Sequence, residues 1–393
     1  MREGWEYKKL GEVCNVYAGQ GAPQGDSNYS DVGTPFIKAG NLSELISGIQ
    51  ESEFQKVSQE VASAHKLKLY KKGSVLFAKS GMSCMKNYIY TLKSDCYVVS
   101  HLAILEPYNI ESKYLQYYLE YKKPNSLVKD ESYPSIALKD IQNMPIVFPQ
   151  DKSQEQSIVS ELDKINELIS LKKEQLKDYD NLAQSIFYDM FGDPVANDKG
   201  WEVKKLGEVY KVTSSKRILQ QDWQTKGIPF YKVADIVNLI NNELVVPAVY
   251  IKESTYEELK HKGLVPKEND ILITSRGTIG MCYIVKSSDK FYFQDGMITW
   301  LLQKEGCILP QYLKSLFEVK SFLDTMLDKV NISTVAYLSI KQMSNATIPL
   351  PPLPLQQAFA KRIEAIEKQK QLISSEIKDL ETLLASRMQY WFD

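Results

Sequence analysis

The sequence contains a long internal repeat. Residues 4–13 (GWEYKKLGEV) return as residues 200–209 (GWEVKKLGEV), identical at nine of the ten positions, and the second copy begins 196 residues after the first. A repeat of this length is far longer than the unit of a solenoid, and it is long enough to form a domain with its own core. The chain of 393 residues is therefore predicted to be a tandem duplication of one domain.

The similarity between the two halves continues beyond this opening motif. Segment 73–81 and its copy at 269–277 each contain a short apolar run followed by a hydroxyl, a base and a glycine, which predicts a buried strand that enters a tight turn. Prolines then close each half and prevent a helix from beginning earlier. The other matching segments are 35–38 with 229–232, 144–149 with 346–351, and the helical-looking segments around 114–115 and 312–313.

After each proline cluster, apolar residues recur at alternating steps of three and four, which is typical of a coiled coil. We expect long helices over 153–192 and 354–393, which leaves globular domains at 1–152 and 193–353. The two helices should pair with each other as an antiparallel intramolecular coiled coil, with a pseudo-two-fold axis relating the halves; pairing with another subunit is the alternative. The expected interface positions are Ile158, Leu162, Ile165, Ile169, Leu176, Tyr179, Ile363, Ile366, Ile373, Ile377, Leu380 and Leu384.

Composition excludes several classes of protein. Hydrophobic residues make up 44% of the chain and charged residues 25%, as in an ordinary soluble globular protein. No apolar stretch is long enough for a membrane span or a targeting segment, so we expect a cytoplasmic protein without a membrane partner. The net charge of −1 means that any nucleic-acid-binding surface must be local.

The sequence carries no recognisable catalytic motif. A phosphate-binding glycine loop is missing, and the E-x-K spacing at 318–320 lacks an aspartate to accompany it. The histidines are scattered, and His101 follows a strand-like run, so we expect it to be a packed or hydrogen-bonded core residue. Metal-ligand spacings are also missing. We therefore expect no catalytic residue, no metal site and no cofactor, and we predict that the chain is not an enzyme.

Irregular polar loops between the strand-like segments suit recognition instead. Their Gln, Asn, Ser, Lys and Arg side chains are able to bond base edges and phosphates, and loops on a rigid scaffold commonly carry contacts. For each residue a solvated loop or turn is the alternative interpretation. The candidate DNA-binding residues are Gln20, Lys38, Lys79, Ser80, Lys86, Ser132, Tyr133, Ser214, Ser215, Lys216, Arg217, Lys232, Ser275, Arg276, Thr278, Asn331 and Ser333.

The opening motif with its copy, the prolines followed by glutamines at 154, 156, 356 and 357, and the two long helices resemble the specificity subunit of type I restriction-modification enzymes. The resemblance covers essentially the whole chain. It implies an α+β fold with two similar strand-rich target-recognition domains, each reading one half of a bipartite, asymmetric site in double-stranded DNA. It further implies that the paired helices set the spacer and bind two methyltransferase subunits, and that restriction (translocase) subunits join for cleavage. S-adenosylmethionine, ATP and magnesium would belong to those partners.

Two alternatives remain at this point. The chain could guide methylation or bind DNA without any restriction subunit, which the same residues would serve equally well. It could also be a coiled-coil scaffold whose globular domains bind peptide or carbohydrate, in which case two concave apolar pockets are expected in place of polar, basic surfaces.

Overall fold

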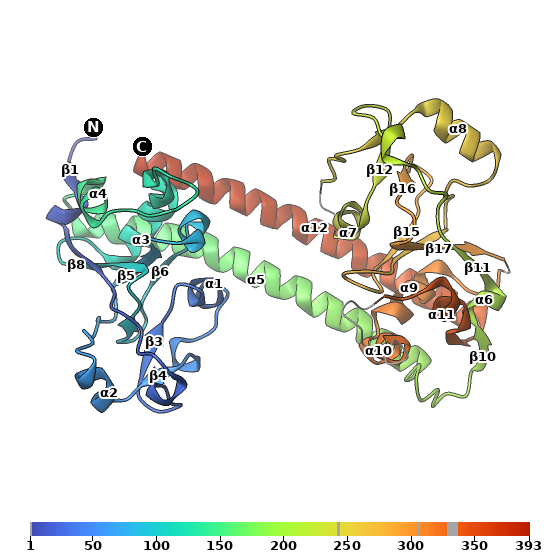
Figure 1. The fold of residues 1–393 in the computed structure, drawn as a ribbon, viewed down its shortest axis with the longest axis horizontal. Helices are drawn as coiled ribbons and strands as arrows, with labels where there is room; N and C mark the ends of the chain where they lie inside the picture. The colour runs from blue at the N-terminus through green and yellow to red at the C-terminus, as the bar shows by residue number, and fades with distance from the viewer. Residues whose placement is uncertain (1, 242–243, 305, 328–336) are drawn as a thin grey trace. The chain divides into compact units, whose positions relative to one another are not determined.

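The computed structural model describes residues 2–241, 244–304, 306–327 and 337–393. Its internal contacts divide the chain into two compact units: unit 1 is Met1–Lys173 with Ser375–Asp393, and unit 2 is Glu174–Ser374. The division falls inside both long helices, α5 (Lys152–Phe191) and α12 (Leu353–Phe392), which Figure 1 draws in green and red. Each unit is therefore completed by part of both helices.

Unit 1 is built on a four-stranded antiparallel sheet of order β2-β8-β5-β6. Its strands are β2 (Cys14–Ala18), β8 (Leu102–Pro107), β5 (Val75–Ala78) and β6 (Ile89–Thr91). A three-stranded sheet of order β4-β3-β7 contains β4 (Lys56–Val57), β3 (Thr34–Ile37) and β7 (Tyr97–Val98), with β3 and β7 parallel. A third pair joins β1 (Trp5–Lys9) to β9 (Pro145–Pro149). The α-helices are α1 (Asn41–Ile46), α2 (Gln59–Ala64), α3 (Ser112–Lys122) and α4 (Leu138–Asn143).

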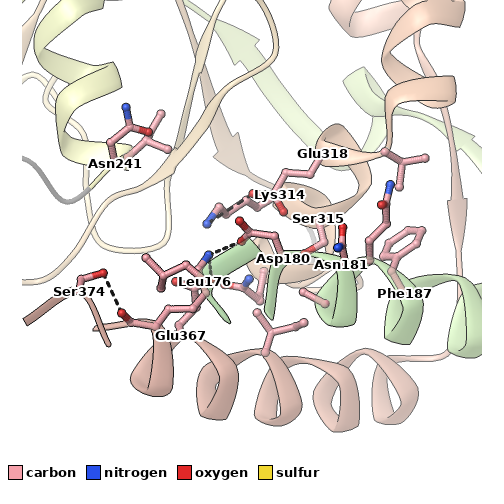
Figure 2. Close-up of a pocket in the computed structure, with 17 residues that line it drawn as sticks. Leu176, Asp180, Asn181, Phe187, Asn241, Lys314, Ser315, Glu318, Glu367 and Ser374 are labelled. Carbon is pink, nitrogen blue, oxygen red and sulfur yellow. Dashed lines mark hydrogen bonds and ion pairs between the residues drawn. The ribbon is translucent and has the colours of Figure 1, made fainter. Parts of the chain in front are cut away.

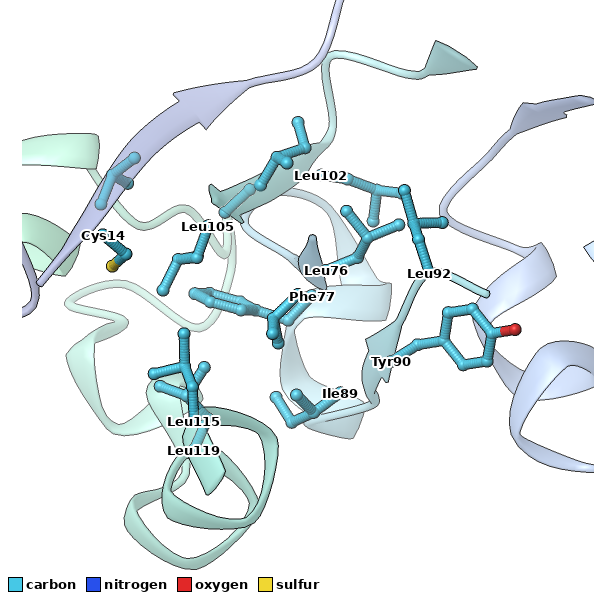
Figure 3. Packing of buried hydrophobic residues seen from close by; sticks show 14 of the residues in the cluster. Cys14, Leu76, Phe77, Ile89, Tyr90, Leu92, Leu102, Leu105, Leu115 and Leu119 are labelled. Atoms are coloured by element: carbon cyan, nitrogen blue, oxygen red, sulfur yellow. The ribbon is translucent and has the colours of Figure 1, made fainter. Parts of the chain in front are cut away.

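The core of unit 1 forms around β5, in which all four residues are buried. A continuous apolar run is expected for a central strand that is covered on both faces. Figure 3 shows Phe77 of this strand directed toward Leu105 of β8 and Leu115 of α3. Helix α3 therefore covers one face of the four-stranded sheet and holds β5 in its centre.

Unit 2 repeats this topology. Its four-stranded sheet has the order β11-β17-β14-β15, from β11 (Tyr210–Thr213), β17 (Ile298–Gln303), β14 (Ile271–Thr274) and β15 (Cys282–Ile284). The three-stranded sheet has the order β13-β12-β16, from β13 (Tyr250–Ile251), β12 (Ile228–Tyr231) and β16 (Tyr292–Phe293), and β10 (Glu202–Lys205) pairs with β18 (Thr347–Leu350). The α-helices are α6 (Leu206–Val209), α7 (Val233–Ile240), α8 (Glu253–His261), α9 (Pro310–Glu318), α10 (Lys320–Leu327) and α11 (Ile340–Asn345). The predicted duplication and α+β class are confirmed.

The two 40-residue helices pair within the chain. In unit 1, Glu161 forms an ion pair with Arg387, and the Lys173 Nζ lies 3.0 Å from the Glu381 Oε1. Residue numbers rise along α5 as they fall along α12, so the predicted antiparallel intramolecular pairing is confirmed. The expected interface positions are buried at Ile158, Leu162, Ile165, Ile169, Ile363, Ile366, Ile373 and Ile377, and half-buried at Leu176, Tyr179, Leu380 and Leu384. Among the described residues, no helix is long and apolar enough to cross a membrane.

An aromatic residue at the end of each long helix packs into a core. In unit 1, Phe392 makes an edge contact with Tyr114 of α3, with ring centroids 5.4 Å apart. In unit 2, Phe191 makes an edge contact with Tyr312 of α9, with ring centroids 4.8 Å apart. Both tyrosine hydroxyls donate to a carbonyl of the adjacent edge pair, at Val147 and Pro349. The same anchor thus holds one helix end in each unit.

Candidate functional site

Several candidate residues of unit 1 gather at one end of its four-stranded sheet. The segments that follow β2 and β5 and precede β8 meet there, because these strands are neighbours and antiparallel. The Ser100 amide donates to the Gln20 carbonyl at 2.8 Å, and the Lys79 amide donates to the His101 carbonyl at 2.9 Å. The loop that contains Ser132 and Tyr133 reaches the same place through a bridge between Ser80 and residue 135. We call this surface the loop end of unit 1.

His101 lies exposed at this loop end, and its Nδ1 is 2.9 Å from the Ser80 Oγ. The expectation of a core residue is therefore wrong, although the residue is hydrogen-bonded. The buried run stops at Val99, because the chain turns between β7 and β8 before Leu102 enters the sheet. Where an apolar run continues across a tight turn, the residues of the turn are exposed although the sequence pattern predicts that they are buried.

The other candidates of unit 1 differ in how freely their side chains face solvent. The Gln20 amide is already engaged: its Nε2 donates to the Lys66 carbonyl at 2.8 Å, and its Oε1 accepts from the Lys68 amide. Lys79 is half-buried, whereas Lys86 and Ser132 are exposed and Tyr133 is 83% exposed. The loop end therefore presents Lys79, Ser80 and His101, while Gln20 holds neighbouring backbone in place.

Unit 2 has the equivalent loop end, where the segments after β11 and β14 meet the segment before β17. The Ser275 amide donates to the Met297 carbonyl at 2.9 Å, as the Lys79 amide does to His101 in unit 1. The serine hydroxyls are bonded within the protein. Ser214 donates to the Ile298 carbonyl at 2.9 Å, Ser215 donates to the Phe293 carbonyl at 2.7 Å, and the Ser275 and Thr299 hydroxyls are 2.6 Å apart.

Charged side chains remain exposed at the loop end of unit 2. Lys216, Arg217, Arg276 and Thr278 are exposed, and Arg217 pairs with Asp295 through its Nε at 2.8 Å. Both arginines line a cavity of about 370 Å³. Asn331 and Ser333 lie outside the described residues.

Lys38 and Lys232 lie just past the ends of β3 and β12, and both are half-buried against an aromatic ring. The ammonium of Lys38 is 4.7 Å from the Tyr29 ring centroid, and that of Lys232 is 4.9 Å from the Trp223 ring centroid. The sequence analysis missed both aromatic partners. In each copy an aromatic residue precedes the lysine by the same number of residues, and this spacing could have identified the two aromatic partners.

A second feature of unit 2 is a cavity of about 530 Å³ lined by α5, α7, α9 and α12 (Figure 2). Its charges are largely paired with one another. The Lys370 Nζ is 2.6 Å from the Asp180 Oδ1 and 3.3 Å from the Glu367 Oε1, and the Lys314 Nζ is 3.6 Å from the Glu318 Oε1. Apolar side chains, among them Phe187 and Ile363, line the cavity beside these paired charges, so it is mixed in character rather than the apolar pocket expected of a peptide-binding scaffold. Glu318 ends α9 and Lys320 begins α10, so the E-x-K spacing spans a helix boundary.

Unit 1 has a large side chain where unit 2 has a small one. The matched tyrosines of α3 and α9 align Tyr117 with Ser315, which lines the cavity of unit 2. Tyr117 is buried, and its hydroxyl donates to Asp163 and accepts from the Asn166 Nδ2 at 3.0 Å. The two copies therefore share a backbone but differ in how the space beside the long helices is filled.

The sequence was compared with protein families and with known proteins, and these comparisons indicate the same family. The family model of the type I restriction modification DNA specificity domain matches twice, over residues 2–178 and 198–382. A Haemophilus influenzae protein described as a type I restriction enzyme specificity subunit is 24% identical over 370 residues, covering 92% of this chain and 87% of that protein. The type I restriction enzyme MjaIX specificity subunit of Methanocaldococcus jannaschii is 22% identical over 403 residues, covering 94% and 89%.

Two solved structures share the fold. The S subunit of a type I restriction-modification system from M. genitalium aligns with a TM-score of 0.54 at 13% identity, covering 99% of this chain and 96% of that one. A chain from a study of complex assembly and conformational transition in a type I system aligns with a TM-score of 0.59 at 18% identity, covering 99% and 97%. At these identities the structural likeness concerns the fold alone.

Proposed function

The chain belongs to the type I restriction-modification DNA specificity family, and from this premise we propose that each unit recognises one half of a bipartite DNA site through its loop end. A specificity subunit selects DNA sequence and is not catalytic; the catalytic activities lie in other subunits. In this proposal the target-recognition domains are residues 1–152 and 193–353. The DNA-facing residues include Lys79, Ser80 and His101 in the first.

One observation carries the proposal: the two loop ends have the same backbone connections but different side chains. Lys79 and His101 of unit 1 correspond to Ser275 and Met297 of unit 2 through the same amide-to-carbonyl hydrogen bond. Arg276, the next residue in unit 2, replaces a serine hydroxyl with a guanidinium group. A guanidinium can bind a guanine edge through two hydrogen bonds, and a matched contact of this kind discriminates by about 1–3 kcal/mol. Different side chains on one scaffold favour two different half-sites.

The long helices complete the proposal. Each has 40 residues, or about 60 Å at 1.5 Å per residue. We propose that their length sets the spacer between the half-sites, and that their exposed faces bind two methyltransferase subunits, with restriction subunits joining for cleavage. Because the net charge of the chain is −1, we expect these partners to supply part of the contacts to the DNA phosphate backbone, in the cytoplasm.

The test is to coexpress the chain with the methyltransferase subunit from the same source and to map methylated bases by single-molecule sequencing. The expected result is a split motif, with two defined blocks around a fixed number of unspecified bases. Arg276→Ala should relax one block, and Lys79→Ala should relax the other. Lys211→Ala, at an exposed position within β11, is the matched control and should leave the motif unchanged. An unsplit motif, or relaxation of both blocks by Arg276→Ala, would refute the proposal.

A further inference from the structure

A lysine, two aromatic rings and a side-chain oxygen that accepts from the lysine amide recur at identical spacing in both units. In unit 1 they are Lys38, Tyr29, Phe36 and Asn41; in unit 2 they are Lys232, Trp223, Phe230 and Asp235. The loops around them have diverged, as the sequences at 18–30 and 212–224 show. A group of side chains that keeps its spacing between divergent loops has the same task in both units.

The geometry of the group is also repeated. Each lysine ammonium lies over its aromatic ring, at 4.7 Å from Tyr29 and 4.9 Å from Trp223. The same rings pack against Phe36 and Phe230, with centroids 6.0 Å and 5.9 Å apart. A cation over an aromatic face is attracted by the ring quadrupole, and the ring restricts the number of places that the ammonium can occupy.

The lysine backbones are held in the same way. The Lys38 amide donates to the Asn41 Oδ1 at 2.8 Å, and the Lys232 amide donates to the Asp235 Oδ2 at 2.8 Å. Both ends of each lysine, its backbone amide and its ammonium, are therefore fixed before any ligand arrives. Such preorganisation reduces the entropy lost when a long side chain is immobilised in a complex.

The positive charge of each lysine is left without an acidic partner. Within the part of the chain that the structure describes, neither ammonium forms an ion pair with a carboxylate, whereas Arg217 is paired with Asp295. The Lys38 Nζ donates to the Gln55 Oε1 at 2.8 Å, which uses one of its three donors. The two remaining donors of Lys38 and its full charge are available to an anion.

Both lysines belong to the loop ends. The Val99 amide donates to the Ile37 carbonyl at 2.9 Å, which places Lys38 beside the segment that leads to His101. In unit 2 the Gln294 amide donates to the Tyr231 carbonyl at 2.9 Å, which places Lys232 beside the segment that leads to Met297. Each lysine therefore lies near the side chains that differ between the two units.

We propose that Lys38 and Lys232 are matched contacts to the DNA phosphate backbone, one in each unit, that position the duplex without reading its sequence. This inference rests on the proposed function. Two half-sites of different sequence share their phosphates and differ in their base edges, so contacts to phosphate should be repeated and contacts to bases should vary. The Lys-aromatic group is repeated, and the residues at Lys79, Ser80 and His101 are not.

The test measures binding of the complex with methyltransferase subunits to a duplex that carries the mapped motif, from 50 to 200 mM salt. Each neutralised phosphate contributes a slope of about −0.9 to log K against log salt. Lys38→Met and Lys232→Met should each reduce the magnitude of the slope by about one. The loss of affinity between the two salt concentrations should then be about fourfold smaller for each variant than for the wild type. The methylated motif should stay unchanged in both variants, and a double variant should show both reductions.

The controls separate this role from a structural one. Lys38→Arg should keep the wild-type slope, and Arg276→Ala should change the motif. An unchanged slope in both Met variants would overturn the inference, as would a changed motif, which would make the lysines base-reading residues. A reduced slope that comes with lost thermal stability in the free chain would also overturn it. Failure of the proposed function is distinguishable, because the wild-type complex would then methylate an unsplit motif or none.

Discussion

Removal of the aromatic anchor at the end of one long helix should destabilise one unit and spare the other. Phe392 is 1% exposed and contacts three tyrosines of α3, with ring centroids 5.4, 5.6 and 5.9 Å away at Tyr114, Tyr118 and Tyr121. In unit 2, Phe191 contacts Phe187, Tyr312 and Phe359 at 5.2, 4.8 and 5.0 Å. Phe392→Ala and Phe191→Ala are therefore a matched pair of substitutions.

The expected cost is similar for the two substitutions. Truncation of a buried phenylalanine to alanine costs about 3–5 kcal/mol, which includes the cavity that is left behind. Loss of the aromatic edge contacts, each about 0.5–1.5 kcal/mol beyond area burial, favours the upper part of that range. For a unit of this size, about 4 kcal/mol corresponds to a fall in melting temperature of roughly 10 °C.

Hydrogen exchange measured by mass spectrometry locates the effect, because amides in separate cooperative units open with separate free energies. Phe392→Ala should speed exchange in α3, residues 112–122, and leave α9, residues 310–318, unchanged; Phe191→Ala should do the reverse. Leu383→Ala, at a position 46% exposed on α12, should stay within about 0.5 kcal/mol of the wild type. Equal acceleration in α3 and α9 by Phe392→Ala would refute the prediction that the two units open separately.

Two further predictions concern the long helices. Tyr117→Ser should destabilise unit 1 by about 3–5 kcal/mol in urea unfolding, because it opens a cavity and removes a hydrogen-bond partner of Asp163 and Asn166. Ser315→Ala should change the free energy of unfolding by less than about 1 kcal/mol, and equal effects of the two substitutions would contradict the different filling of the two copies. The hydrogen bond from Arg387 lowers the pKa of Glu161 below 4.5, so the stabilisation by this ion pair should be fully present above that pH and lost as pH falls through the lowered pKa. The difference in free energy of unfolding between the wild type and Glu161→Gln should therefore shrink in acid, and a difference that grows in acid would contradict the prediction.

Periodicity and self-similarity were sufficient to predict the architecture from the sequence. Steps of three and four identified the long helices, and their pairing followed from the matching apolar stripe of each helix. The antiparallel direction followed from the pseudo-two-fold symmetry of the duplication. The buried strands β5 and β14 were visible as apolar runs that end in a turn. These features depend on hydrophobic patterns that are local in sequence. Such a pattern determines which side of a helix or strand is buried, whatever the rest of the chain does.

The candidate site was less predictable, because it depends on which side chains the fold already uses. Gln20, Ser214 and Ser275 have suitable chemistry for DNA, but their polar atoms bond to the protein itself. His101 was missed because a turn interrupts its strand-like run. Residue type alone does not show whether a donor is free, and distant backbone segments decide this once the sheet is formed.

The division of the chain into units also has a consequence for synthesis on the ribosome. Unit 2 is one continuous segment, Glu174–Ser374, whereas unit 1 needs both Met1–Lys173 and Ser375–Asp393. The segment Met1–Lys173 therefore cannot complete its core until Ser375–Asp393 has been translated, because Phe392 is part of the core of unit 1. A nascent chain with complete N-terminal sheets should expose the apolar surface of α3 until residue 392 has been added, which comes after the last residue of unit 2. Helix α12 thus makes the first unit in sequence the last to be completed.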